Sequence, residues 1–234
     1  MIPILAFAFL TPGMAYCLIM FVILFALIAQ MRVSSSFGKY SRVKARSGVT
    51  GAEAAREILD AADIHDVEIQ VGESFLGDHY DPTQKRLILS PNVANGASIA
   101  SLGVAAHECG HAIQHKLGYA PLKARMAVVP ATMFASQLLP FVVIGGFFFH
   151  FGPLIDLGIV VYSILTVFQL ITLPVEFDAS SRAKIILKQM GLVSADEAPA
   201  VSNVLGAAAM TYVAAFLSSL FHLVYLIALR NSRN

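Results

Sequence analysis

The sequence predicts a membrane protein of four transmembrane helices that carries a small α+β cap. The composition supports this class, because 57% of the 234 residues are hydrophobic, the mean hydropathy is +0.71 and only 13% are charged. Soluble domains typically have roughly 25% charged residues. Four stretches contain no charged residue, namely 1–31, 126–155, 157–175 and 198–229. Most of the polar residues form one sizeable block, 32–125.

Each charge-free stretch is long enough to span a bilayer. A helix rises ~1.5 Å per residue and needs roughly 20 apolar residues to cross a ~30 Å hydrocarbon core. The first stretch lacks the basic start of a signal peptide and exceeds its usual apolar length, so we expect it to stay as an anchor. The predicted organisation begins with a first transmembrane helix (1–31) and a cap (32–125). A transmembrane hairpin (126–175), a connector (176–206) and a last transmembrane helix with its tail (207–234) follow.

The positions of the basic residues predict the orientation. Lys and Arg cluster in 32–46, 116–125 and 182–188, whereas the hairpin tip 150–153 has neither. By the positive-inside bias, the cap and the connector face the cytoplasm and the N-terminus lies outside a bacterial-type inner membrane. Arg230 and Arg233 oppose this bias. The run 32–46 is interpreted as facing lipid headgroups, and nucleic acid is not expected as a partner.

The cap is predicted to contain helices and strands. Thr50-Gly51-Ala52-Glu53 has the spacing of a capping box and begins an amphipathic helix over 51–62. Residues 67–71 alternate as in a half-buried strand, and two further strand-like runs flank the turn signal at 81–84, which predicts a β-hairpin. A helix is expected from about residue 95–98 through His115.

HECGH at 107–111 is the pattern that indicates chemistry. Residues four apart on a helix share one face, ~40° apart, so His107 and His111 can bind one zinc ion. In HExxH sites the glutamate does not bind the metal but takes a proton from the water that the metal activates, a role that falls to Glu108. The ordinary alternative is a set of polar residues on an exposed helix.

A catalytic zinc needs a third protein ligand, for which three candidates exist. His115 is ~12 Å along the helix axis from His107, which is too far for one ion. His79 in the hairpin is possible. Glu176 is favoured, because two membrane crossings return the chain to the side from which the HExxH helix departed. Asp178 lies ~200° around a helix from Glu176 and is expected to support the metal ligands or to face solvent.

HECGH at 107–111, GDHYDP at 77–82 and VEFDAS at 175–180 together resemble the YugP-type membrane proteins, the neutral zinc metallopeptidases of family 2. The chain is also similar to the HtpX-like gluzincins, but Ser180 stands where their E-x-x-A-D pattern has aspartate. The resemblance covers nearly the whole chain. It implies a gluzincin-like zinc metallopeptidase cap, Zn²⁺ as cofactor and Glu176 as the third ligand.

The function expected from these features is a membrane-embedded zinc metalloendopeptidase that acts on membrane or misfolded proteins. Glu108 would activate a zinc-bound water for attack on a peptide carbonyl. The oxyanion needs a further partner, for which the candidates are His79, Tyr80 and Tyr119. The strand over 85–90 is expected to pair with an extended polypeptide substrate. Cys109 is expected to pack in the core, and His222 to form a hydrogen bond between helices.

Three alternatives stay open. The first is a non-catalytic membrane scaffold or protein-assembly factor that the metal stabilises. The second is an intramembrane protease, which the short apolar run 99–106 before the motif argues against. The third is a transporter, for which the spans lack charged residues. Substrate identity and oligomeric state are not predicted.

Overall fold

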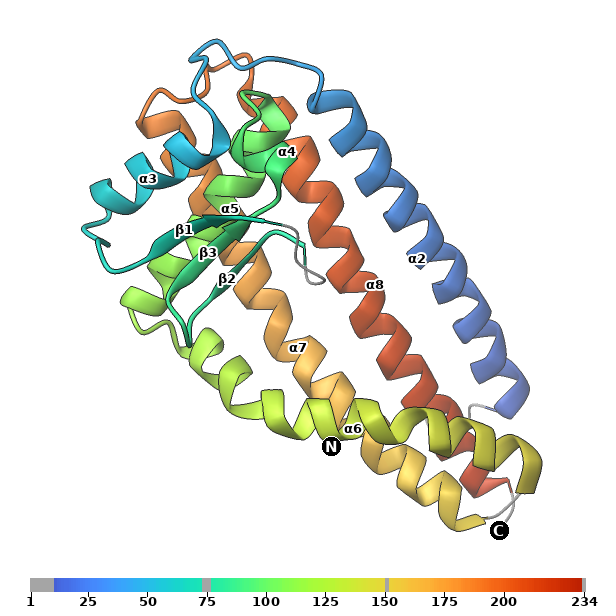
Figure 1. Ribbon diagram of the computed structural model, residues 1–234. Helices are drawn as coiled ribbons and strands as arrows, with labels where there is room; N and C mark the ends of the chain where they lie inside the picture. The colour runs from blue at the N-terminus through green and yellow to red at the C-terminus, as the bar shows by residue number, and fades with distance from the viewer. Residues whose placement is uncertain (1–10, 73–76, 150–151, 233–234) are drawn as a thin grey trace. The chain divides into compact units, whose positions relative to one another are not determined.

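The computed structural model describes residues 11–72, 77–149 and 152–232, which are mostly helical with one small sheet (Figure 1). The start of the predicted first span, 1–10, and residues 150–151 of the predicted hairpin tip lie outside the described residues. The same holds for the last two residues of the predicted tail, 233–234.

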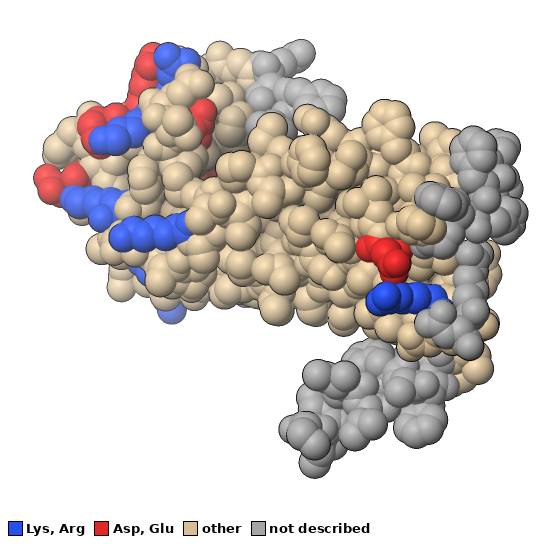
Figure 2. All heavy atoms as spheres, turned by 90° about the horizontal axis from the view of Figure 1, so that it is seen from below, with Lys and Arg blue, Asp and Glu red and all other residues tan. Residues whose placement is uncertain are grey.

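Four long helices dominate the described chain: α2 (Pro12–Tyr40), α6 (Ala120–Phe149), α7 (Gly152–Gln189) and α8 (Ala198–Asn231). Within the described ranges, these four are long and apolar enough to cross a membrane. Figure 2 shows one face of the molecule, on which charged side chains gather over one part and a broad stretch carries none. The expectation of four long apolar helices is confirmed. Helix α7 continues past Pro174, so the predicted boundary between hairpin and connector lies inside one helix.

The chain divides into two compact units. The first comprises Met1–Ile28, Ala124–Leu173 and Thr211–Asn234, and its described part is helical. Its core includes Ala135, Val142 and Val161. Only three of its described residues are charged, and two of them pair, because Arg230 Nε donates to Asp156 Oδ1 at 2.9 Å.

His222 in the first unit differs from its prediction. Its Nδ1 lies 2.7 Å from the carbonyl oxygen of Ser218 in the same helix, and its ring stacks on Tyr162 of α7 at 5.1 Å between centroids. The contact of His222 with α7 is ring stacking, whereas its Nδ1 bonds within α8.

The second unit, Ala29–Lys123 and Pro174–Met210, contains the predicted cap. It holds helices α3 (Gly51–Ala61), α4 (Pro91–Ala94) and α5 (Ile99–Lys116) and strands β1 (Glu68–Val71), β2 (His79–Asp81) and β3 (Arg86–Leu89). Helix α3 packs against α5, and the sheet packs on α5 through β2 and β3 (Figure 1). Its core lies between these layers and includes Ile58, Leu59, Leu87, Leu89 and Leu102.

Helices α3 and α5 begin where the sequence predicts. The Thr50 hydroxyl accepts from the N–H of Glu53 at 3.3 Å, and the Glu53 carboxylate accepts from the N–H of Thr50 at 2.8 Å, which completes the capping box of α3. Helix α5 begins after Ser98, whose side chain accepts from the N–H of Ser101. Both caps supply partners for amide groups that have none inside a helix.

The sheet confirms the hairpin but corrects its proposed use. Strands β2 and β3 are antiparallel, and β1 pairs with β3 in parallel, so the order is β1-β3-β2. Strand β3 is therefore central, with partners on both sides. The expectation that 85–90 pairs with a substrate is wrong, because its backbone groups are already used by the two neighbouring strands. The edge beside α5 belongs to β2.

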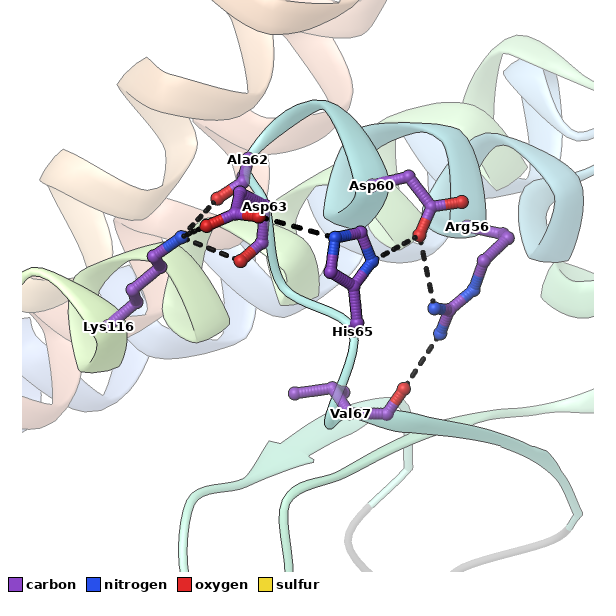
Figure 3. A network of polar contacts seen from close by, with 7 residues as sticks. All are labelled: Arg56, Asp60, Ala62, Asp63, His65, Val67 and Lys116. Carbon is purple, nitrogen blue, oxygen red and sulfur yellow. Dashed lines mark hydrogen bonds and ion pairs between the residues drawn. The ribbon is translucent and has the colours of Figure 1, made fainter.

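A polar network joins the ends of α3 and α5 (Figure 3). Lys116 Nζ donates to the carbonyl oxygens of Ala62 and Asp63 at 2.8 and 2.6 Å and to the Asp63 carboxylate at 2.9 Å. His65 lies between Asp60 and Asp63, with its two nitrogens 3.4 and 3.3 Å from their carboxylates. One lysine thus supplies donors to carbonyl groups just beyond the end of α3, which fixes the end of α5 against it.

Candidate metal centre

Three side chains from two helices converge in the second unit. His107 and His111 lie one turn apart on α5, and Glu176 lies on α7. The Nε2 atoms of the two histidines are 3.2 and 3.6 Å from Glu176 Oε2. Among the described residues, these three form a group whose ligand atoms all lie within 4.8 Å of one another.

This spacing fits a zinc ion. Two ligand atoms bound about 2.0–2.1 Å from zinc at a tetrahedral angle lie about 3.3 Å apart, close to both nitrogen-to-oxygen distances. Two imidazoles and one carboxylate form a donor set found in catalytic zinc sites. The structure therefore brings together the three residues predicted as ligands, in an arrangement that can hold the ion.

The three side chains of the site are largely buried. The Glu176 side chain is 2% exposed, whereas that of His107 is 13% exposed. A buried carboxylate needs a cation or several hydrogen-bond donors to offset its loss of hydration. A metal ion at this place would meet that need.

The other ring nitrogens of the two histidines have polar partners. Nδ1 of His107 lies 3.1 Å from the hydroxyl of Ser180, and Nδ1 of His111 lies 3.0 Å from Oε1 of Gln114. Such contacts fix the ring orientation of metal-binding histidines and the nitrogen that they present to the metal. In this structure both rings present Nε2 to Glu176.

Asp178 supports the site indirectly. Its carboxylate accepts from Gln114 Nε2 at 2.8 Å and from Arg182 Nε at 2.6 Å. The carboxylate does not join the group of candidate ligands in the described chain. Asp178 thus contacts Gln114, which in turn contacts His111, in agreement with its predicted position behind the candidate ligands.

Glu108 is buried beside the two histidines. Its Oε2 accepts from the backbone N–H of Tyr80 on β2 at 3.0 Å. Burial raises the pKa of this carboxyl, against the opposing influence of the neighbouring histidines. The edge strand β2 thereby holds the side chain predicted to act as the general base.

Tyr80 is the predicted oxyanion partner that the structure links most directly to Glu108, through its backbone. Its hydroxyl lies 2.8 Å from Nδ1 of His115. Burial, followed by the charges of Asp66 and Asp81, raises the pKa of Tyr80 to about 12, so the phenol stays protonated and can donate to that nitrogen.

The remaining candidates have other described contacts. His79 Nδ1 is 2.9 Å from the carbonyl oxygen of Gly77, and the backbone N–H of Tyr119 donates to the carbonyl oxygen of Gln114. His115 contacts Tyr80 and, as its distance along α5 predicts, is not part of the described group of candidate ligands. Cys109 is buried with Sγ 3.6 Å from the carbonyl oxygen of Ala55, and burial raises its thiol pKa, so it packs as predicted.

Helices α5 and α7 approach closely at a glycine inside the motif. A Cβ at Gly110 would lie 2.8 Å from the backbone oxygen of Ala179. Real Cβ atoms do not come this near to a backbone oxygen. The hydrogen at this position therefore permits the crossing that brings the Glu176 side chain to the histidines.

Sequence reasoning missed Gln114 altogether. The available signal was its spacing, because a residue three positions after His111 lies on the same helix face. Ser180 was noticed only as a departure from the acidic residue of similar proteins. Its position, one turn after Glu176, places its hydroxyl on the first histidine.

Comparison with known proteins finds a matching family and a similar curated protein. A family described as "Putative neutral zinc metallopeptidase" matches residues 15–231. The curated protein "Putative membrane protease YugP" of Bacillus subtilis (strain 168) is 49% identical over 196 residues, which cover 84% of this chain and 87% of that protein. No solved structure matches the chain. The extent of both matches shows that the chain belongs to the family described as "Putative neutral zinc metallopeptidase".

Proposed function

We propose that this chain is a membrane-embedded zinc metalloendopeptidase, with His107, His111 and Glu176 as the metal ligands and Glu108 as the general base. The observation that carries the proposal is the convergence of two Nε2 atoms on one buried carboxylate oxygen at distances suited to zinc. Membership of a zinc metallopeptidase family supports it.

The metal and the chain have separate tasks in this reaction. Zinc, when bound, supplies a Lewis acid that lowers the pKa of water and polarises a carbonyl group. Glu108 accepts the proton of the attacking water and can return it to the leaving amine. The N–H of Tyr80 holds the Glu108 carboxylate beside the histidines. Gln114 and Ser180 hold the two imidazole rings.

We further propose that the four long helices span a bacterial-type inner membrane, with the metal centre on the cytoplasmic side and the N-terminus outside. The basic residues predict this orientation. Arg230, one of the two residues that opposed it, donates to Asp156, and the ion pair offsets the positive charge at that end of α8. The name "membrane protease" of the relative supports substrates that are polypeptides, and a site near lipid favours membrane or misfolded proteins.

The test is zinc content and peptidase activity of the detergent-purified protein. Wild type is expected to hold about one zinc per chain, as one three-ligand site predicts. Glu176→Ala should lose most of the metal. Glu108→Gln should keep it while activity falls by a factor on the order of 10²–10⁴, the typical contribution of a general base. Glu57→Ala, an exposed glutamate on α3, is the matched control for the loss of a carboxylate.

The outcomes separate the alternatives. Full zinc content in Glu176→Ala would place the third ligand elsewhere, with His79 as the next candidate. A protein that keeps zinc and shows the same cellular phenotype with Glu108→Gln would be the metal-stabilised scaffold or assembly factor. Loss of activity with retained zinc in Glu108→Gln supports the peptidase.

A further inference from the structure

We infer that Gln114 is a positioning residue of this site, which fixes the nitrogen that His111 presents to the metal and joins the two helices that carry the ligands. The inference rests on the proposed zinc site. It assigns to Gln114 a role that the HExxH motif does not contain, because the glutamine lies three residues beyond the second histidine.

Gln114 is fully buried, with 0% of its surface exposed. A buried primary amide is stable only when its donors and its acceptor have partners. Here both ends are used. Oε1 lies 3.0 Å from Nδ1 of His111, and Nε2 donates to the carbonyl oxygen of Val175 and to the carboxylate of Asp178, each at 2.8 Å.

The partners of Gln114 determine the direction of its amide. The carbonyl oxygen of Val175 and the carboxylate of Asp178 are acceptors, so the amide end that faces them must be the NH₂ group. The oxygen end therefore faces His111, whose Nδ1 must carry the proton in order to donate to it. In the neutral ring, Nε2 of His111 then carries the lone pair, which is the form that binds a metal.

The same amide connects two of the three candidate ligands. Val175 directly precedes Glu176, so the bond from Gln114 to its carbonyl holds the α7 backbone next to the carboxylate ligand. The opposite end holds the ring of His111 on α5. The two ligands are thus kept in register by one side chain, and ligands held in place in advance lose less freedom when the ion binds.

Asp178 determines the strength of this arrangement. Its charge strengthens the hydrogen bond from Gln114, since bonds to ionised acceptors are stronger than neutral ones. Arg182 holds the same carboxylate oxygen at 2.6 Å, so the acceptor cannot turn away. His107 has a separate partner in Ser180. A change at Gln114 therefore acts on His111 and the α7 backbone and leaves the contact of His107 in place.

The test compares Gln114→Leu, Gln114→Glu and the double variant Gln114→Glu/Asp178→Asn with wild type. Zinc affinity is measured by chelator competition in detergent, and the visible absorption spectrum is recorded after Co²⁺ replaces zinc. Gln114→Glu keeps the size of the side chain and an acceptor for His111 but loses the donors to Val175 and Asp178. The double variant offers an amide donor from position 178. Gln84→Glu, in the exposed turn after β2, is the control for the added charge.

Gln114→Leu is expected to weaken zinc binding by a factor on the order of 10–100, the usual effect of removing such a support. Gln114→Glu is expected to weaken it by a smaller factor, because its carboxylate still accepts from His111 while the donors to Val175 and Asp178 are lost. The Co²⁺ spectrum should change in shape, and the double variant should recover part of the affinity lost in Gln114→Glu. Wild-type affinity and spectrum in folded single variants would overturn the inference and leave the zinc site standing. Absence of metal binding by wild type would overturn both proposals. If Gln114→Leu fails to fold, the size-matched Gln114→Glu decides.

Discussion

The hydroxyl of Ser180 lies 3.1 Å from Nδ1 of His107. This serine makes a contact of the kind that a carboxylate makes with a metal-binding histidine. The first histidine of this chain is thus supported by a neutral oxygen. Its partner His111 is likewise supported by a neutral amide.

Replacing Ser180 tests the strength of this neutral support. Ser180→Ala is expected to weaken zinc binding by about tenfold, and Ser180→Asp to strengthen it by about tenfold, because a carboxylate makes the imidazole a more basic ligand. Chelator competition measures both. Ser181→Ala, at the adjacent exposed position, is the control. Equal affinities in all four proteins would show that the contact has no influence on the metal.

Gly110→Ala should destabilise the protein and loosen the site. The added Cβ would lie 2.8 Å from the backbone oxygen of Ala179, so the two helices must move apart. We expect a loss of about 1–3 kcal/mol in the free energy of unfolding, as for other overpacked positions, together with weaker zinc binding. Thermal unfolding with and without zinc measures both.

Gly103→Ala is the matched control on the same helix. Its Cβ would lie 3.7 Å from Val201, an ordinary contact, so the change should be neutral or stabilising by up to about 1 kcal/mol through helix propensity. If the two variants unfold alike, the close approach at Gly110 does not constrain the crossing of α5 and α7.

Removal of the metal should lower the melting temperature. A ligand present at about 100 times its dissociation constant stabilises the folded state by about 2.7 kcal/mol, which corresponds to roughly 5–10 °C for a chain of this size. Addition of a chelator to wild type should produce that decrease. Glu176→Ala should show little change on the same addition, and an equal decrease in that variant would place the stabilising metal elsewhere.

The network around Lys116 should contribute to stability without contributing to metal binding. Lys116→Met removes three donor contacts at the end of α3 and is expected to lower the melting temperature by roughly 2–4 °C. Lys85→Met removes one exposed ion pair with Asp66 and should have a smaller effect. Zinc affinity should stay at the wild-type value in both, and a loss of affinity in Lys116→Met would contradict this separation.

The proposed orientation predicts the side of the C-terminus. With four spans and the N-terminus outside, the C-terminus lies outside as well. Arg230 in the last turn of α8 opposes this placement, because basic residues favour the cytoplasmic side. A C-terminal fusion to a phosphatase that folds only outside the cytoplasm should be active, and the same fusion inside the loop 190–197 should be inactive. The reverse pattern would invert the orientation and place the metal centre on the outer face.

Local patterns predicted the individual elements well. The capping box at Thr50 and Glu53 depends on residues three positions apart, and the pairing of His107 with His111 depends on four, so both can be read from a short segment. The long apolar helices follow from the absence of charge over some 20 residues or more. Glu176 was selected from its likeness to known proteins and from the even number of intervening spans.

Long-range contacts limited the rest. The contacts of Gln114 and Ser180 with the two histidines depend on how α5 crosses α7. That crossing depends on the close approach of Gly110 to Ala179, 69 positions away in the chain. The central place of β3 likewise depends on its parallel pairing with β1, which no turn signal reveals. A pattern of residue types cannot show which strand lies between two others.

The candidate metal centre is formed by two short segments of the chain. The three candidate ligands, both histidine supports and the close helix contact all fall within 107–114 of α5 and 175–182 of α7. Each segment is eight residues, or about two turns of helix. The arrangement is therefore a pair of short helical segments that cross closely. A designed bundle whose helices cross as closely as Gly110 and Ala179 do would need these sixteen positions, and packing that buries them, to present a two-histidine, one-glutamate site.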